Sequence, residues 1–220
     1  MQIINFHGVG RPERVLEPGE GPFWLGTEQF RHLLDRIAGH ADRGNLAITF
    51  DDSNISDLTI ALPELLKRGL SASFFVLTGR LGHPGSLAAA DVAELHASGM
   101  AIGSHGVDHS DLTKLSATRL TTELAQSRAM LEEICGSEVN TFAIPFGRYN
   151  REVLHSIRRA GFSAAFTSDG GIAREQSFLK PRRSVRNQMS PQEIESALSG
   201  RLPVLKRLRR AAGMQLKQLS

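Results

Sequence analysis

The sequence predicts an α/β fold in which helices connect the strands of a parallel sheet. Short apolar segments alternate with amphipathic segments about seven times along the 220 residues, which is typical of this class. Composition does not shift along this pattern, and neither a linker nor an internal repeat interrupts it, so we expect a single domain. Polar residues follow most of the apolar segments, where the carboxyl ends of parallel strands place ligand sites.

The strands are expected at short apolar runs flanked by polar residues or glycine. They cover residues 2–6, 46–50, 71–77, 100–103, 141–145 and 163–168, with a further strand-like run at 179–185. Pattern alone leaves two architectures open, an open doubly wound sheet and a closed (β/α) barrel. Both place their ligand sites at the carboxyl ends of the strands.

The helices are expected where apolar residues recur at helical spacing between start and stop signals. They cover residues 27–38, 55–69, 88–99, 116–136, 151–161 and 190–200. Pro63 interrupts the second of these helices, and Gly69 ends it. Pro191 suits the first turn of the last one.

Composition excludes several classes of protein. Hydrophobic residues make up 40% and charged residues 22%, as in ordinary globular proteins. The single cysteine, Cys135, excludes an internal disulfide, and no apolar run reaches 18 residues. The N-terminal segment lacks the basic stretch and long apolar core of a secretion signal, so we expect a cytoplasmic protein.

The net charge of +3 belongs to the C-terminal end. Residues 201–220 hold six Lys or Arg and no acid, which leaves 20 basic and 23 acidic residues in 1–200. We therefore divide the chain into a folded body, 1–200, and a basic C-terminal helix or tail, 201–220. The tail fits peripheral contact with an anionic membrane and also fits a solvated helix. Nucleic acid is not an expected partner, since aromatic residues make up only 6% and no nucleic-acid motif is present.

The residues that follow the strands point to a metal site. Asp51 and Asp52 follow one strand, and His105 and His109 follow another. Two imidazoles and one carboxylate form a metal site with open positions, and one helical turn between the histidines would place both on one face. The histidines alone would also suit a solvated surface, but a carboxylate pair at a neighbouring strand end favours the metal. The second carboxylate is then free to act as a general base.

Three segments, "TFDDSNISD", "GSHGVDH" and "FAIPFG", resemble in order and separation the first three motifs of the polysaccharide deacetylase family, carbohydrate esterase family 4. The resemblance runs from about residue 6 to about residue 187 and implies a distorted (β/α)7 barrel. It also implies removal of acetyl groups from N-acetylated sugars with a divalent metal, zinc first and cobalt or nickel as alternatives.

The resemblance assigns roles by position. Asp51 matches the general base, and Asp52, His105 and His109 match the metal ligands. Pro145, Phe146 and Gly147 match the wall of the substrate groove, where the Phe146 N–H would help to hold an oxyanion.

The chain departs from the family pattern at three places. Ser53 stands where the family has glycine, Ala143 stands where it has the arginine that orients the base, and no histidine follows His155 to act as general acid. Arg182 or Arg183 is a candidate for the missing arginine, with Arg182 preferred, although both also suit the surface.

His7 is the candidate for the missing acid, and a histidine bonded to backbone at the barrel mouth is the alternative reading of this residue. Asp51 could instead return the proton itself.

The sequence thus predicts a metal-dependent carbohydrate deacetylase, a hydrolase of linear amides that acts on an N-acetylated amino sugar of a polysaccharide or its precursor. Two alternatives stay open. One is an O-deacetylase or a non-sugar amidase on the same scaffold, and the other is a catalytically weak protein that binds metal and glycan. The sequence predicts no oligomeric state.

Overall fold

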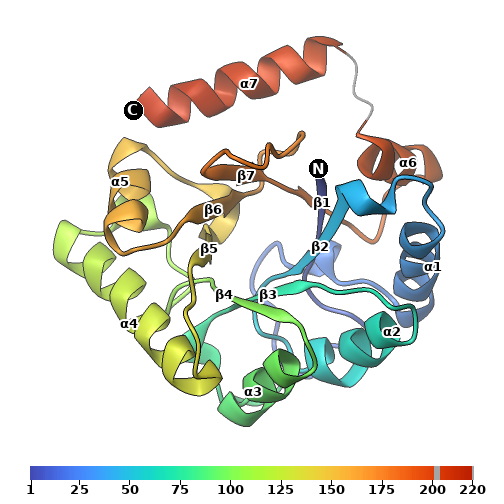
Figure 1. Ribbon diagram of the computed structural model, residues 1–220, viewed down its shortest axis with the longest axis horizontal. Helices are drawn as coiled ribbons and strands as arrows, with labels where there is room; N and C mark the ends of the chain where they lie inside the picture. Colours follow the sequence, from blue (N-terminus) through green and yellow to red (C-terminus); the bar gives the residue numbers. More distant parts are fainter. Residues whose placement is uncertain (201–203, 220) are drawn as a thin grey trace.

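An eight-stranded parallel sheet forms the centre of the molecule, and helices surround it (Figure 1). The computed structural model describes residues 1–200 and 204–219, and it gives only the backbone of residues 204–208. The strand order is β7-β6-β5-β4-β3-β2-β1-β8. In chain order the strands are β1 (Gln2–Phe6), β2 (Leu46–Phe50), β3 (Ser73–Val76), β4 (Ala101–Ser104), β5 (Thr141–Ala143), β6 (Ala164–Thr167), β7 (Leu179–Pro181) and β8 (Arg183–Ser184).

One short segment connects the two edges of this sheet. β7 pairs with β6 at one edge and β8 pairs with β1 at the other, yet only Arg182 separates β7 from β8. The Arg182 N–H donates to Thr167 O on β6, and the Val185 N–H donates to Asn5 O on β1. The sheet is therefore a nearly closed, distorted (β/α) barrel, as predicted, and counting this segment as one strand gives the expected seven.

The helices follow most of the predicted boundaries. They are α1 (Thr27–Ala38), α2 (Leu62–Leu66), α3 (Ala89–Ala97), α4 (Ala117–Cys135), α5 (Arg151–Arg159), α6 (Pro191–Ser199) and α7 (Val204–Leu219). Ser116 caps α4 by accepting the Arg119 N–H, and Gly136 ends it in the left-handed conformation. Among the described residues, none of the helices combines the length and apolarity that crossing a bilayer requires.

The segment predicted as one helix at 55–69 differs. A π-helical turn, Asp57–Ala61, precedes the short α2, and Pro63 lies in the first turn of α2. Proline has no N–H to donate to the preceding turn, so the regular hydrogen-bond ladder starts anew at this point.

Strand alternation separates the core from the barrel interior. Ile4, Phe6, Ile48 and Phe50 pack in the main hydrophobic core, whereas the intervening Asn5 and Thr49 hydrogen-bond to each other at 2.7 Å.

The barrel interior itself is narrow. Phe75 and Phe166, with ring centroids 4.7 Å apart, lie beside the guanidinium of Arg182. A Cβ at Gly103 would come within 2.5 Å of the Phe75 ring, so glycine is needed on this strand.

Within the basic C-terminal segment, residues 204–219 form α7, which packs against the barrel. α7 lies beside α5 (Figure 1), and Met214 contacts the hydrophobic core. Lys217 Nζ donates to Asp169 Oδ1 at 2.6 Å and to Gly147 O at 3.2 Å. At least one basic residue of the tail is thus paired within the protein. Arg201 lies outside the described residues, as do the side chains of Lys206 and Arg207.

Candidate active site and metal centre

A cleft of about 700 Å³ opens at the carboxyl ends of the strands. Residues that follow five of the strands line it: His7, Asp51, Asp52, His105, His109, Phe146 and Asp169. The predicted convergence of Asp51 and Asp52 with His105 and His109 is therefore present in the structure. Arg182 joins them from the segment that closes the barrel.

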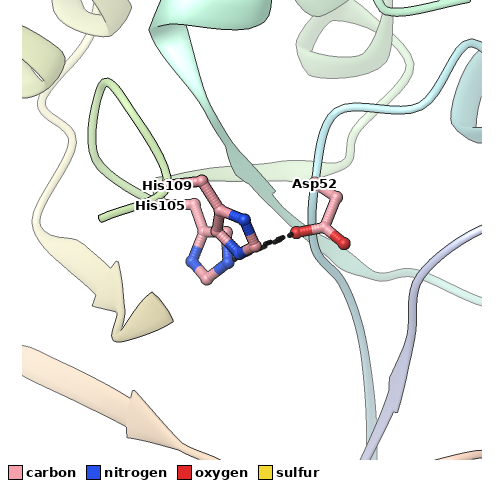
Figure 2. A group of neighbouring side chains, drawn as sticks. All are labelled: Asp52, His105 and His109. Carbon is pink, nitrogen blue, oxygen red and sulfur yellow. Dashed lines mark ion pairs between the residues drawn. The ribbon is translucent and has the colours of Figure 1, made fainter. Parts of the chain in front are cut away.

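Asp52, His105 and His109 form a group that fits a metal ion (Figure 2). Nε2 of each histidine lies 3.5 Å from the same oxygen, Asp52 Oδ1. A tetrahedral ion with bonds of about 2.1 Å separates its ligand atoms by about 3.4 Å, so the spacing suits a first-row divalent ion. Asp52 Oδ1 is buried and accepts no hydrogen bond from the described residues, which is the environment of an oxygen that takes a cation.

Hydrogen bonds at the opposite ring nitrogens orient both imidazoles. His105 Nδ1 lies 2.8 Å from Ala143 O, and His109 Nδ1 lies 3.1 Å from Glu17 Oε2. If Nδ1–H donates to these oxygens, the lone pair of each Nε2 faces Asp52, as metal ligation requires. Glu17 was not predicted as a site residue, because no pattern in its glycine-rich loop indicates that it lies next to His109.

The carboxylates give the site a negative field. Burial raises the pKa of Asp52, but the adjacent His105 imidazole and the charges of His7 and His109 hold it well below its usual range. Burial lowers the pKa of His105, yet the charges of Asp51 and Asp52 raise it overall. Burial lowers the pKa of His109, so this ring is neutral near pH 7. A divalent cation is favoured by this field and by the neutral ring.

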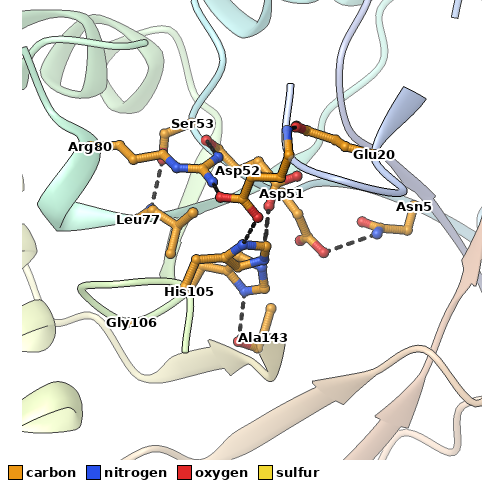
Figure 3. A network of polar contacts seen from close by, with 12 residues as sticks. Asn5, Glu20, Asp51, Asp52, Ser53, Leu77, Arg80, His105, Gly106 and Ala143 are labelled. Carbon is orange, nitrogen blue, oxygen red and sulfur yellow. Dashed lines mark hydrogen bonds and ion pairs between the residues drawn. The ribbon is translucent and has the colours of Figure 1, made fainter. Parts of the chain in front are cut away.

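Asp51 forms a buried pair with Arg182. Arg182 Nη1 donates to Asp51 Oδ1 at 2.7 Å, and Nη2 donates to Oδ2 at 2.8 Å. Asn5 Nδ2 donates to Oδ2 at 3.0 Å (Figure 3). Burial raises the pKa of Asp51, but the charges of Arg182 and His105 outweigh it, so the pKa lies below its usual value.

Asp51 is therefore ionised and held in one orientation. The family resemblance expects an arginine at the position of Ala143. Arg182, from another segment, supplies this guanidinium instead. Arg183, the other candidate, donates instead to Ser196 Oγ on α6.

Backbone strain is concentrated at this site. In the described part of the chain, the non-glycine residues with positive φ are Asp52 (78°), Ser53 (58°), His109 (50°) and Phe146 (58°). Such conformations cost of order 1–3 kcal/mol each and persist where function or packing fixes them. Ser53 thus adopts the conformation that favours the family's glycine, and its hydroxyl accepts the Leu77 N–H at 2.7 Å.

The helical turn expected between His105 and His109 is absent. A loop through Gly106, at φ 90°, and the left-handed His109 bring the two rings to a centroid distance of 5.3 Å. The spacing of four residues therefore works through a glycine turn rather than through helical periodicity.

The predicted groove wall lies against the histidine pair. Pro145–Gly147 forms a 3₁₀ turn after β5, and the half-exposed ring of Phe146 lies with its centroid 4.4 Å from that of His109, the two planes tilted by 36°. In the described residues the Phe146 N–H has no acceptor. That N–H is available to an oxygen in the cleft.

His7 lies in the same cleft, with its ring 4.9 Å from the ring of Phe23. Its Nδ1 is buried and has no hydrogen-bond partner in the described part of the chain, so this nitrogen does not make the backbone bond of the alternative reading.

Asn5 and Thr49 belong to the site and were missed from sequence. Arg182 Nη1 donates to Asn5 Oδ1 at 2.9 Å and to Thr49 Oγ1 at 3.3 Å. The available signal was a polar residue inside each of two apolar strands, at positions that face the barrel interior.

A nearly closed (β/α) barrel with a carboxylate and two imidazoles at its mouth defines a class, the metal-dependent barrel hydrolases. The family model for "Polysaccharide deacetylase" matches residues 38–165. This chain belongs to the polysaccharide deacetylase family.

Relatives agree with this assignment. YxkH of Bacillus subtilis is 28% identical over 159 residues, which cover 72% of this chain and 56% of YxkH. The peptidoglycan-N-acetylglucosamine deacetylase PgdA of Listeria monocytogenes is 30% identical over 113 residues, 51% of this chain and 23% of PgdA. The chain thus matches only about half or less of these proteins.

Solved structures share the fold. The deacetylase PplD of Streptococcus pyogenes, in complex with acetate, superposes with a TM-score of 0.77 at 24% identity, covering 92% of this chain and 98% of that one. IcaB from Ammonifex degensii gives a TM-score of 0.73 at 22% identity over 90% and 95% of the two chains.

Proposed function

We propose that this chain is a metal-dependent deacetylase that removes N-acetyl groups from an amino sugar of a polysaccharide or its precursor. One observation carries the proposal: an ionised Asp51, paired with a fully buried Arg182, lines the same cleft as the triad Asp52, His105 and His109. The names of relatives support the substrate class. PgdA acts on N-acetylglucosamine of peptidoglycan, and a relative from Azorhizobium caulinodans, 26% identical over 121 residues, is a chitooligosaccharide deacetylase.

Asp52, His105 and His109 would hold the divalent ion, zinc first and cobalt or nickel as alternatives. Zinc suits two imidazoles and a carboxylate with a position left open. The chemistry that such an ion supplies when bound is Lewis acidity toward a carbonyl and a lower pKa for water.

The residues around the triad supply the remaining proton transfers and charge stabilisation. Asp51 takes the proton of the attacking water, and Arg182 keeps the carboxylate ionised and pointed into the cleft. The Phe146 N–H stabilises the charge that develops on the carbonyl oxygen, an effect of about 3 kcal/mol per donor in comparable sites. Pro145 and Gly147 fix the turn that presents this N–H. His7 protonates the leaving amine, a role supported by its position in the cleft.

The test is acetate release from N-acetylglucosamine oligomers by the purified chain with zinc, cobalt or nickel. We expect Asp51→Asn and His105→Ala to abolish turnover, since they remove the base and a metal ligand. His155→Ala, an exposed histidine on α5, is the matched control and retains activity. Turnover that survives both site variants would refute the assignment.

Substrate comparison separates the alternatives. An O-deacetylase releases acetate from O-acetyl glycans and leaves N-acetyl glycans intact. A catalytically weak binding protein binds the oligomers and releases no acetate with any of the three metals.

A further inference from the structure

Three arginines line one wall of the cleft, and the proposed chemistry uses none of them. Arg183 lies on β8, Arg186 follows that strand, and Arg210 reaches the cleft from α7. Segments far apart in the sequence thus place three guanidinium groups beside one cavity. Arginine keeps its charge in proteins, so this wall is cationic at any working pH.

The acidic residues of the same cleft have other partners. Asp51 is paired with Arg182, Asp52 lies against His105 and His109, Glu20 is paired with Arg14, and Glu17 with Arg80 and His109. Asp169 accepts from Tyr149, Thr167 and Lys217, and Glu193 accepts the Ser190 N–H in the capping box of α6. No ion pair joins Arg183, Arg186 or Arg210 to a carboxylate of the described residues.

Arg210 has an unfilled hydrogen-bonding site. Its Nη1 is buried and has no hydrogen-bond partner among the residues that the structure describes. A Cβ at Gly170 would lie 3.0 Å from Arg210 Cζ, so the guanidinium packs closely on the loop that follows β6. A buried donor without a partner costs about 1–3 kcal/mol, and more when the group is charged.

Arg183 and Arg210 also repel each other. Burial lowers the pKa of Arg183 below its ordinary value, and the charge of Arg210 lowers it further. An anion between the two groups would remove both the repulsion and the missing hydrogen bond. Guanidinium groups bind carboxylates and phosphates through paired, charge-assisted hydrogen bonds.

We propose that Arg183, Arg186 and Arg210 form an anion subsite, and that the N-acetylated substrate carries an oxyanion close to the sugar that loses its acetyl group. This inference rests on the proposed function and narrows its substrate to acidic glycans or phosphorylated precursors. One cleft of about 700 Å³ contains both the triad and the arginine wall, and clefts of this size enclose drug-sized ligands. A single substrate can therefore reach both.

Two matched pairs of substrates test the subsite. The first pair is an oligosaccharide in which N-acetylglucosamine alternates with glucuronic acid, and the same oligosaccharide as its neutral methyl ester. The second pair is an N-acetylglucosamine oligomer with and without a phosphate monoester. We expect the enzyme to prefer the charged member of one pair by about tenfold or more in kcat/KM, the range of a charge-assisted hydrogen bond. The pair that shows the preference tells carboxylate from phosphate.

Variants then connect the preference to these residues. Arg210→Gln and Arg183→Gln should each remove most of the preference and change turnover of the neutral member by less than about twofold, because an uncharged substrate makes no ion pair with the arginine wall. Arg209→Gln, an exposed arginine on the same helix outside the cleft, is the control and keeps the preference. Equal turnover within both pairs, or an equal loss on charged and neutral substrates in the variants, would overturn the subsite.

Failure of the subsite and failure of the proposed function remain distinguishable. Affinities for both members of each pair, measured by titration calorimetry, do not require turnover. A charge preference in affinity without acetate release would refute the deacetylase and keep the subsite. Acetate release without a charge preference would support the deacetylase and refute the subsite.

Discussion

Replacing Arg182 with glutamine leaves the buried carboxylate of Asp51 without its guanidinium partner. Arg182 is 0% exposed and makes both bonds of a bidentate pair, at 2.7 and 2.8 Å. Breaking one partner out of a buried pair costs about 3–5 kcal/mol, because the remaining charge stays desolvated. For a chain of this size that corresponds to a drop in melting temperature of roughly 6–20 °C. Thermal unfolding in the presence of chelator measures it.

The loss should depend on pH with a definite sign. In the wild type the pKa of Asp51 is lowered, so its contribution to stability is present above the ordinary carboxyl pKa of about 3.9 and fades as the pH falls through the lowered value. In the variant, burial raises this pKa, so the contribution of Asp51 is present at low pH and fades as the pH rises. The stability gap between the two proteins therefore widens from about pH 4 to pH 7. The acidic limb of kcat/KM should move to higher pH for the same reason.

Asp51→Asn combined with Arg182→Gln is the control. With both charges removed, the double variant should lose less stability than the sum of the two single variants, and the difference measures the coupling of the pair. An exposed ion pair contributes less than about 1 kcal/mol to stability. Arg182→Gln could instead lose only that much stability, with no dependence on pH. That result would refute the buried, base-orienting role of Arg182.

Three further predictions concern the metal and the tail. Chelation should lower the melting temperature, and zinc at 100 times its Kd should restore about 2.7 kcal/mol of folding stability. Asp52→Ala should abolish this response to zinc. A melting temperature that chelation leaves unchanged would contradict a metal site at the triad. Glu17→Gln should weaken zinc binding about 10–100-fold in a competition assay, because Glu17 orients His109 at 3.1 Å, while Glu13→Gln leaves it unchanged. We propose that the protein is cytoplasmic and touches the membrane through its basic tail, so deletion of residues 201–220 should lower its content in the membrane fraction; equal content would refute this proposal.

Much of the fold followed from local pattern. β1 and β2 have the boundaries expected from "QIINF" and "LAITF", and α1 has those expected from its apolar face. The structure of segment 55–69 did not follow from local pattern, because Pro63 separates a short helix from a preceding π-helical turn. The cluster of Asp52, His105 and His109 also followed from sequence, since parallel strands bring their carboxyl ends to one edge.

The sequence by itself determined which residue types meet at the barrel mouth, because strand alternation and the motif order fix their positions along the chain. Only the tertiary structure decided which arginine serves Asp51, how a loop rather than a helix joins His105 to His109, and that α7 brings Arg210 to the cleft. These contacts join residues more than 100 positions apart, or depend on left-handed backbone that local periodicity does not encode. Arg182 lies in the segment that pairs with both edges of the sheet, so closure of the barrel and the pairing of Asp51 depend on the same segment.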